Sequence, residues 1–167
     1  MPVPFSCKGG GTVSQLMIVN RTPDTKDRLA WNWSEGGETT VAELGNPAAT
    51  DDYALCVYDV SDFVAPYVLL FAARVPAGAD WHATRTGFRY RNPIGTPDGI
   101  RSVRLVSGSA DKAKVSVGAK GEFLPLGPAG QPLPLPLLVQ LENVAGSCWG
   151  AYFYAARSND GTVFKSP

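Results

Sequence analysis

Three cysteines are the residues of this chain whose type and setting point most directly to a specific chemistry, the formation of a disulfide bond. Cys56 lies in the segment DDYALCVYDV and Cys148 in GSCWGAYFYAA, and both are rich in the aromatic and aliphatic residues that strands favour. Because facing strands can bring two Cβ atoms within the ~3.5–4.5 Å that a disulfide needs, we predict a Cys56–Cys148 bridge. The alternatives are a bridge from Cys7 to either of these cysteines, or three free thiols. A disulfide would place the protein in the periplasm, at the cell surface or in the extracellular medium.

Residues suited to catalysis or metal binding are few. The chain has a single histidine, His82, and no GxSxG segment, so a hydrolase is only a remote alternative. We therefore predict no catalytic, cofactor-binding or metal-binding residue. Calcium is the one cofactor that the acidic residues leave open, although the chain has no DxDxDG-type loop. Three pairs of carboxylates lie in turn-rich segments, where such side chains usually accept turn hydrogen bonds: Asp24/Asp27, Asp51/Asp52 and Asp59/Asp62.

The tryptophans offer a binding role instead. Trp31 and Trp33 are two residues apart, so a strand would carry both on one face. Two exposed indoles on a sheet would form a platform on which a sugar stacks, and Trp81 is a third aromatic residue of this kind. The favoured interpretation is burial of Trp31 and Trp33 in the core together with Leu29, because aromatic side chains gain most from burial.

Charge is balanced overall but unevenly distributed. The formal net charge is zero at pH 7, which gives no electrostatic reason for binding nucleic acid or an anionic membrane. Residues 35–62 contain seven acidic residues and no basic one, whereas residues 63–120 contain nine basic and three acidic residues. We expect the acidic and basic strands to be neighbours that form ion pairs across the sheet surface. The alternative is head-to-tail docking on further copies of the chain. No apolar stretch approaches the ~18 residues of a membrane-spanning helix, so we predict no membrane insertion.

The elements that position these residues are predicted to be strands. The 167 residues fit a single domain over residues 15–167, preceded by an extended N-terminal arm over residues 1–14. Hydrophobic and polar residues alternate through much of the chain, and 18 glycines and 14 prolines punctuate the short apolar runs. About ten short strands in this pattern predict an all-β fold, either an antiparallel β-sandwich or a jelly-roll-like arrangement.

Three segments carry more specific expectations. Thr39–Leu44 is expected to form a short strand. Tyr67–Val75 is a continuous apolar run, which predicts a strand buried on both faces. Gly121–Pro136 contains five prolines and is expected to be an extended crossover.

The segments KDRLAWNW, TTVAELGNPAATDDYALCVYD, TPDGI, KAKVSVGAKG and CWGAYF follow one another along the chain. Together they resemble an uncharacterised family of exported β-domains from environmental proteobacteria. The resemblance covers most of the chain and implies export and an all-β fold, but it implies no activity and no site residue. Family members often carry a close pair of cysteines before the tryptophan that matches Trp81. Ala77–Asp80 has none, so this loop is expected to be held by packing alone.

These features favour a non-catalytic, extracellular structural or interaction module of a secreted or cell-surface bacterial protein. Its expected partner is another protein or further copies of the chain. The uneven charge, the third cysteine and the N-terminal arm would suit a subunit that gives a strand to its neighbour. The alternative is a carbohydrate-binding module that uses exposed tryptophans on a glycan.

Overall fold

The computed structural model describes residues 7–64 and 66–167, and it folds them into two packed β-sheets. The predicted β-sandwich is confirmed. In spatial order, the five-stranded sheet consists of β1 (Lys8–Gly9), β11 (Cys148–Phe153), β10 (Leu137–Asn143), β4 (Tyr53–Asp59) and β5 (Val68–Val75). The eight-stranded sheet consists of β12 (Ser158–Asn159), β13 (Val163–Lys165), β2 (Gln15–Val19), β3 (Arg28–Trp33), β9 (Lys114–Lys120), β8 (Ile100–Val106), β7 (Gly87–Arg91) and β6 (Trp81–Thr84).

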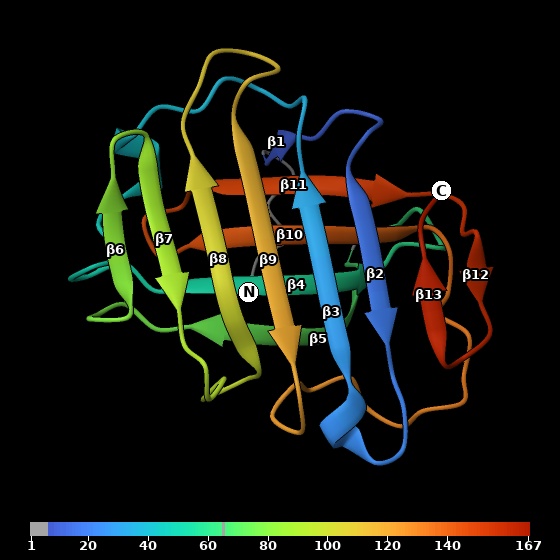
Figure 1. The fold of residues 1–167 in the computed structure, drawn as a ribbon. Coiled ribbons are helices and arrows are strands. Elements are labelled where there is room, and N and C mark those ends of the chain that lie inside the picture. Colours follow the sequence, from blue (N-terminus) through green and yellow to red (C-terminus); the bar gives the residue numbers. More distant parts are fainter. Residues whose placement is uncertain (1–6, 65) are drawn as a thin grey trace.

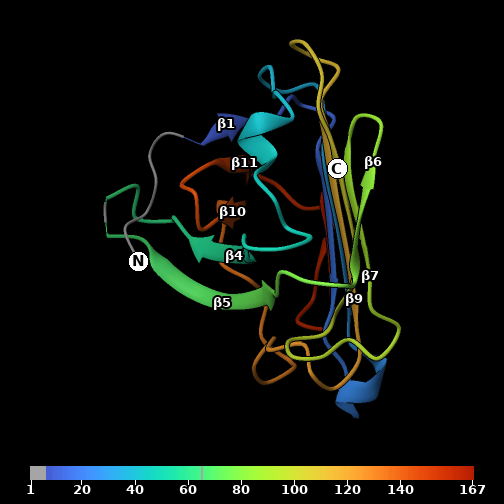
Figure 2. The same cartoon turned by 90° about the vertical axis from the view of Figure 1, so that its left-hand side faces the viewer.

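The two sheets lie face to face with their strands crossed. Figure 1 shows the strands of the eight-stranded sheet in front, running across those of the five-stranded sheet behind. Figure 2 shows the larger sheet edge-on with the smaller one along a single side of it. Among the described residues, all strand pairs are antiparallel except β1 with β11, where Lys8 lies opposite Trp149 and Gly9 opposite Gly150 in parallel register.

Alternation along the strands places the core between the sheets. In β3, Leu29, Trp31 and Trp33 are buried, while Arg28 and Asn32 face solvent. A run of aromatic rings then joins the two layers, with ring centroids 5.2–6.3 Å apart, in the order Trp149, Tyr53, Trp81, Tyr90. Contacts between aromatic rings stabilise the fold beyond the burial of their apolar surface. The core of the sandwich therefore does not depend on a dense set of disulfides.

Two predicted strands differ in the structure. β5 is not buried on both faces: it is an edge strand that pairs only with β4, and the side chain of Val68 is 58% exposed. Thr39–Leu44 is not a strand. Thr39 forms one isolated bridge to Gly108, and Ala42–Leu44 is a turn of 3-10 helix. Thr40 and Glu43 hydrogen-bond each other's backbone N–H groups, which is a capping box that starts a helical turn.

The loop before Trp81 is held by hydrogen bonds and not by packing alone. The Ala77 N–H donates to the Asp52 carboxylate at 2.7 Å, and the Gly78 N–H donates to the Pro47 carbonyl at 2.9 Å. The Trp81 indole N–H donates to the Pro76 carbonyl at 3.0 Å. Two further strands that the sequence pattern missed, β12 and β13, extend the eight-stranded sheet beyond β2.

The predicted Cys56–Cys148 bridge is wrong. Cys7 and Cys148 form the disulfide, with their Cα atoms 4.6 Å apart, and Cys56 is a buried free thiol. Cys56 and Cys148 lie in one sheet, on β4 and β11, with β10 between them. Two strand spacings of ~4.8 Å put their Cα atoms roughly 10 Å apart, beyond the reach of a disulfide. Cys7 precedes β1, which pairs beside Trp149, and so it reaches Cys148 directly.

The N-terminal arm is therefore part of the fold from Cys7 onward, since β1 forms one edge of the five-stranded sheet. The arm's residues 1–6 lie outside the described residues. Gly121–Pro136 contains no strand and connects β9 in one sheet to β10 in the other, so the predicted crossover is confirmed, although turns and bends at residues 121–124 and 128–130 interrupt its extended course.

Candidate functional site

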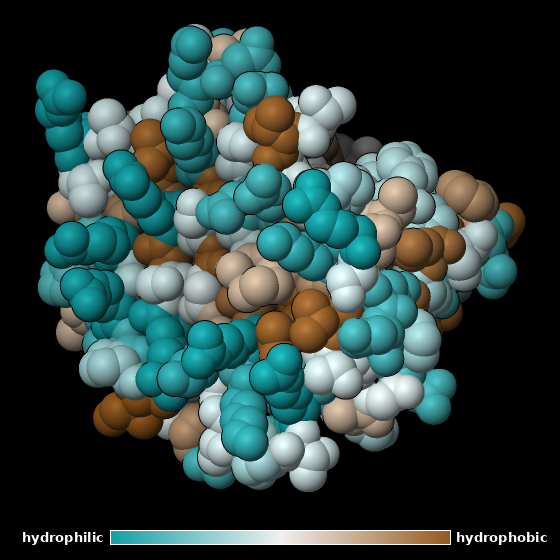
Figure 3. Space-filling model, turned by 45° about the vertical axis from the view of Figure 1, so that its right-hand side comes forward, coloured by the Kyte–Doolittle hydropathy of each residue, from teal (hydrophilic) through white to brown (hydrophobic). Residues whose placement is uncertain are grey.

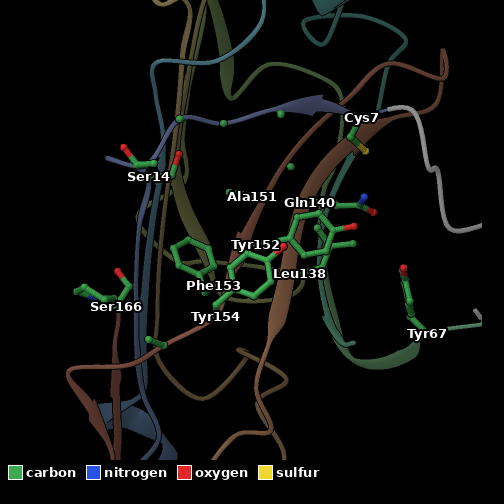
Figure 4. A pocket seen from close by; sticks show the side chains of 17 residues that line it. Cys7, Ser14, Tyr67, Leu138, Gln140, Ala151, Tyr152, Phe153, Tyr154 and Ser166 are labelled. Carbon is green, nitrogen blue, oxygen red and sulfur yellow. The ribbon is translucent and has the colours of Figure 1, made fainter. Parts of the chain in front are cut away.

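The candidate site is a hollow of about 480 Å³ at the free side of β11, which we call the β11 groove. Figure 4 shows Tyr152, Phe153 and Tyr154 at its centre, with Ser14 and Ser166 on one side and Tyr67 on the other. The groove is lined by three segments, Gly9–Thr12, Gly150–Ala155 and Ser166–Pro167, together with the side chains of Cys7, Ser14, Tyr67, Leu138 and Gln140.

The groove exists because β1 is much shorter than β11. The pairing of the two strands ends at Gly9 and Gly150, and the Gly10 N–H then donates to the Gly150 carbonyl at 2.8 Å. In a strand, residues two apart point their backbone groups to the same side. The backbone N–H and C=O of Tyr152 therefore face the groove, and no described strand pairs with Ala151–Phe153 on that side.

Glycine at position 10 allows the chain to leave β11 at this point. A Cβ atom on Gly10 would lie 2.5 Å from the Ser14 hydroxyl and 2.7 Å from the indole of Trp33. Without that atom, the chain passes close to Trp33, turns away from the five-stranded sheet and enters β2 in the other one. The free segment of β11 follows directly from this early departure.

The walls of the groove are fixed by hydrogen bonds. The Trp33 indole N–H donates to the carbonyls of Lys8 and Gly150, at 3.2 Å each. The Ser14 hydroxyl accepts from the Ser34 N–H at 3.3 Å, and the Ser166 hydroxyl accepts from the Leu16 N–H at 3.0 Å. Both serine hydroxyls thus hold backbone in place. The groove is a preformed surface whose polar lining atoms include the backbone of Tyr152.

Two tyrosines provide the exposed aromatic surface here. The rings of Tyr152 and Tyr154 are stacked, with centroids 5.9 Å apart and planes inclined by 21°, and they are 47% and 67% exposed. Burial against its neighbours, and then the charge and hydrogen bond of Tyr67, raise the pKa of the Tyr152 hydroxyl above its usual value. The Tyr152 hydroxyl is therefore neutral at physiological pH.

The tryptophans that the sequence offered as a sugar platform cannot form one. Trp31, Trp33 and Trp81 are 0%, 1% and 3% exposed, so the interpretation that Trp31 and Trp33 pack in the core with Leu29 is confirmed. The exposed aromatic pair was missed, although its signal lies in CWGAYFYAA. Trp149, Ala151 and Phe153 alternate inward, which leaves Tyr152 on the opposite face.

One carboxylate of each pair accepts a local hydrogen bond as predicted, whereas Asp52 instead accepts from the Ala77 N–H, 25 positions later in the chain. Asp27 is buried and accepts a hydrogen bond from the Arg21 N–H at 2.7 Å, and burial raises its pKa. Asp51 accepts from the Asn46 N–H at 2.6 Å, and Asp59 from the Ser61 N–H at 2.8 Å. Within residues 7–64 and 66–167, no three His, Cys, Asp or Glu side chains gather as a metal site would require. His82 is exposed on β6, an edge strand of the larger sheet.

Comparison of the chain with models of protein families, with curated proteins and with solved structures found no match. Among the described residues, no helix has the length and apolar character needed to span a membrane. The fold and the groove together define a disulfide-bridged β-sandwich in which part of the edge of β11 is free and faces the groove.

Proposed function

We propose that this chain is a non-catalytic interaction module of a secreted or cell-surface bacterial protein, and that it receives an extended segment of a partner protein at the β11 groove. The observation that carries this proposal is the free edge of β11 from Ala151 to Phe153, which faces the preformed β11 groove. A peptide that pairs there would add a strand in line with β1 and gain main-chain hydrogen bonds.

The surroundings of the edge support this role. Free sheet edges invite pairing with other chains, and proteins usually cover or charge them. Here the lining carries glycines and tyrosines, and none of its described side chains is a lysine, arginine, aspartate or glutamate. Lys8 and Gly9 already pair with β11 of their own chain, and Cys7 is bridged to Cys148. Residues 7–9 of the arm are thus engaged within the molecule, which favours a segment of another protein as the incoming strand.

The same bridge supports the proposed location. A disulfide between the arm and β11 is of the kind that persists in oxidising compartments. This supports a place in the periplasm, at the cell surface or in the extracellular medium.

The experiment selects peptides from a random twelve-residue phage library on the folded protein and compares three variants. Tyr152→Ala removes the ring but keeps the edge N–H. Tyr152→Pro removes the ring and the edge N–H. It keeps the backbone hydrogen bonds between β11 and β10, because the Tyr152 N–H points away from β10. Tyr154→Ala is the matched ring deletion outside the strand.

We expect the selected peptides to alternate hydrophobic and polar residues, to bind Tyr152→Ala, and to lose roughly tenfold or more in affinity on Tyr152→Pro. Hydrogen exchange of the Tyr152 amide should slow when a selected peptide is bound. Equal affinity for Tyr152→Pro and Tyr152→Ala, or no slowing at that amide, contradicts strand addition.

A carbohydrate-binding module is the second candidate, and the stacked pair of exposed tyrosines is the observation that favours it. Parallel rings of this kind suit the flat face of a sugar. On a panel of neutral polysaccharides, this function predicts that Tyr152→Ala and Tyr154→Ala each abolish binding. Retention of binding by both variants, or no binding of any glycan by the parent protein, removes it.

A further inference from the structure

A second surface, unrelated to the β11 groove, lies on the outer face of the eight-stranded sheet. Four arginines, Arg89, Arg91, Arg101 and Arg104, line a shallow hollow of about 540 Å³ there, which we call the arginine hollow. The hydroxyl-bearing residues Ser102 and Ser116 lie among them. Figure 3 shows this face obliquely, and hydrophilic side chains cover most of its left half.

Strand register brings these like charges together. Arg89 on β7 lies directly opposite Arg104 on β8, and Arg91 lies opposite Ser102. The register of β8 shifts between Ile100 and Ser102. Ile100 and Val103 are both buried, so this bulge leaves Arg101 and Ser102 together on the outer side. Two like charges directly opposite each other destabilise a sheet, so local stability does not account for this arrangement.

The ion pairs expected between the acidic and basic segments do not neutralise the arginines. The two ion pairs of the described residues are Lys8–Glu43 and Arg74–Asp98, and neither joins residues 35–62 to residues 63–120. That expectation was wrong because β4, which follows most of the acidic residues, lies in the five-stranded sheet, whereas the arginines lie in the other. The Nε of Arg101 donates to the Lys120 carbonyl at 3.3 Å, but neither ion pair engages any of the four arginines, so their remaining N–H groups can bind an external anion.

A row of uncharged polar side chains continues from the hollow across the sheet. The pairing of β7, β8, β9, β3 and β2 sets Arg89, Arg104, Ser116, Asn32 and Gln15 side by side in that order. At ~4.8 Å per strand, the row is roughly 19 Å long. Hydroxyl and amide groups of this kind hydrogen-bond to sugar hydroxyls, and guanidinium groups bind carboxylates and sulfates through two N–H groups at once.

We infer that the arginine hollow and this row bind a linear acidic polysaccharide. An open, shallow surface holds a single small anion weakly, but a polymer with repeated charges engages several arginines at once and gains from multivalency. Single-stranded nucleic acid is disfavoured, because proteins bind it with aromatic rings on which bases stack. The one ring that lines the described hollow, Tyr90, is buried.

The test measures binding of polygalacturonate and dextran sulfate at 150 mM salt, with neutral dextran as the uncharged control. Two double variants carry the same loss of charge. Arg89→Gln with Arg104→Gln changes the hollow, and Arg21→Gln with Arg157→Gln changes two exposed arginines outside it. The parent protein should bind at least one of the two acidic polymers and not dextran.

We expect the hollow variant to lose roughly tenfold or more in affinity and the control variant less than about twofold. The unfolding midpoint of the hollow variant should be unchanged or higher, because a like-charge pair has been removed. Should that variant fail to fold, Arg91→Gln alone is expected to weaken binding about threefold or more. Equal losses in the two double variants overturn the inference. So does tighter binding of poly-glutamate or of a 20-base-pair DNA duplex than of either polysaccharide, and so does no binding of any acidic polymer.

Discussion

Trp31 and Trp33 form a matched pair for testing what a single buried hydrogen bond contributes to this fold. Both indoles lie on the inner face of β3 and are fully buried, so replacement by phenylalanine removes the same volume from the same layer of the core. They differ at the indole nitrogen. Trp33 donates to the Lys8 and Gly150 carbonyls, whereas no described group accepts a hydrogen bond from Trp31.

The magnitudes follow from this difference. Trp33→Phe loses the hydrogen bonds that tie β1 to β3 and β11, a cost of about 1–2 kcal/mol beyond the cavity. Trp31→Phe removes a buried donor that has no partner within the described chain, which regains about 1–3 kcal/mol of desolvation and offsets part of the cavity cost. We therefore expect Trp33→Phe to be less stable than Trp31→Phe by about 2–5 kcal/mol.

Urea unfolding followed by far-ultraviolet circular dichroism measures both free energies of unfolding, and equal m-values confirm that the denatured states are alike. Hydrogen exchange at the Gly10 amide adds a local measurement, because this amide bonds to the Gly150 carbonyl beside the Trp33 indole. It should exchange faster in Trp33→Phe only. The reasoning is refuted if the two variants are equally stable, or if Trp31→Phe is the less stable one.

Three further predictions concern the cysteines and the buried carboxylate. Replacing Cys7 and Cys148 together by serine should lower the free energy of unfolding by about 2–5 kcal/mol, because the bridge closes a long loop with a sequence separation of 141. An unchanged urea midpoint would contradict the bridge. Cys56 should not react with a thiol reagent at pH 8 until the protein unfolds, because it is buried and burial raises its pKa to about 12; stoichiometric labelling of the native protein would refute this. Burial also raises the pKa of Asp27 above 3.8, so the folded state holds this proton where the unfolded state has lost it, and stability should fall as pH rises through that window. Asp27→Asn should remove that part of the fall in the free energy of unfolding, measured by urea titrations between about pH 3.5 and 7. If the free energies of unfolding of the variant and the parent protein differ by the same amount at every pH, Asp27 does not titrate in this way.

Local patterns were sufficient for most of the strands. The alternation of Leu29, Trp31 and Trp33 with polar residues predicted both the strand and the side that is buried. Such patterns did not predict burial correctly where the exposure of a strand depends on its position in the sheet. The apolar run of β5 resembles a strand buried on both faces, yet it lies at a sheet edge and exposes Val68. The spacing of Thr40 and Glu43 is typical of a capping box, which predicts a helical turn and not the strand that we expected there.

The candidate sites depend on contacts that no local pattern contains. The β11 groove exists because β1 pairs with only two residues of a strand about 140 positions later in the chain. The arginine hollow depends on the register of β7 against β8 and on one bulge. The sequence shows that Arg89 and Arg104 are basic, but their separation is a property of the sheet.

Sequence patterns alone were enough for the all-β class, the inward face of β3 and the local hydrogen bonds of Asp27, Asp51 and Asp59. These are local properties, because a strand's side chains alternate and a turn's hydrogen bonds join near neighbours. Three outcomes could be read only from the folded chain: which cysteines are bridged, that Trp31, Trp33 and Trp81 are buried while Tyr152 and Tyr154 are exposed, and where the edge of β11 is free. Those outcomes depend on which strands become neighbours and in which register, and that is settled by packing between residues far apart in the chain.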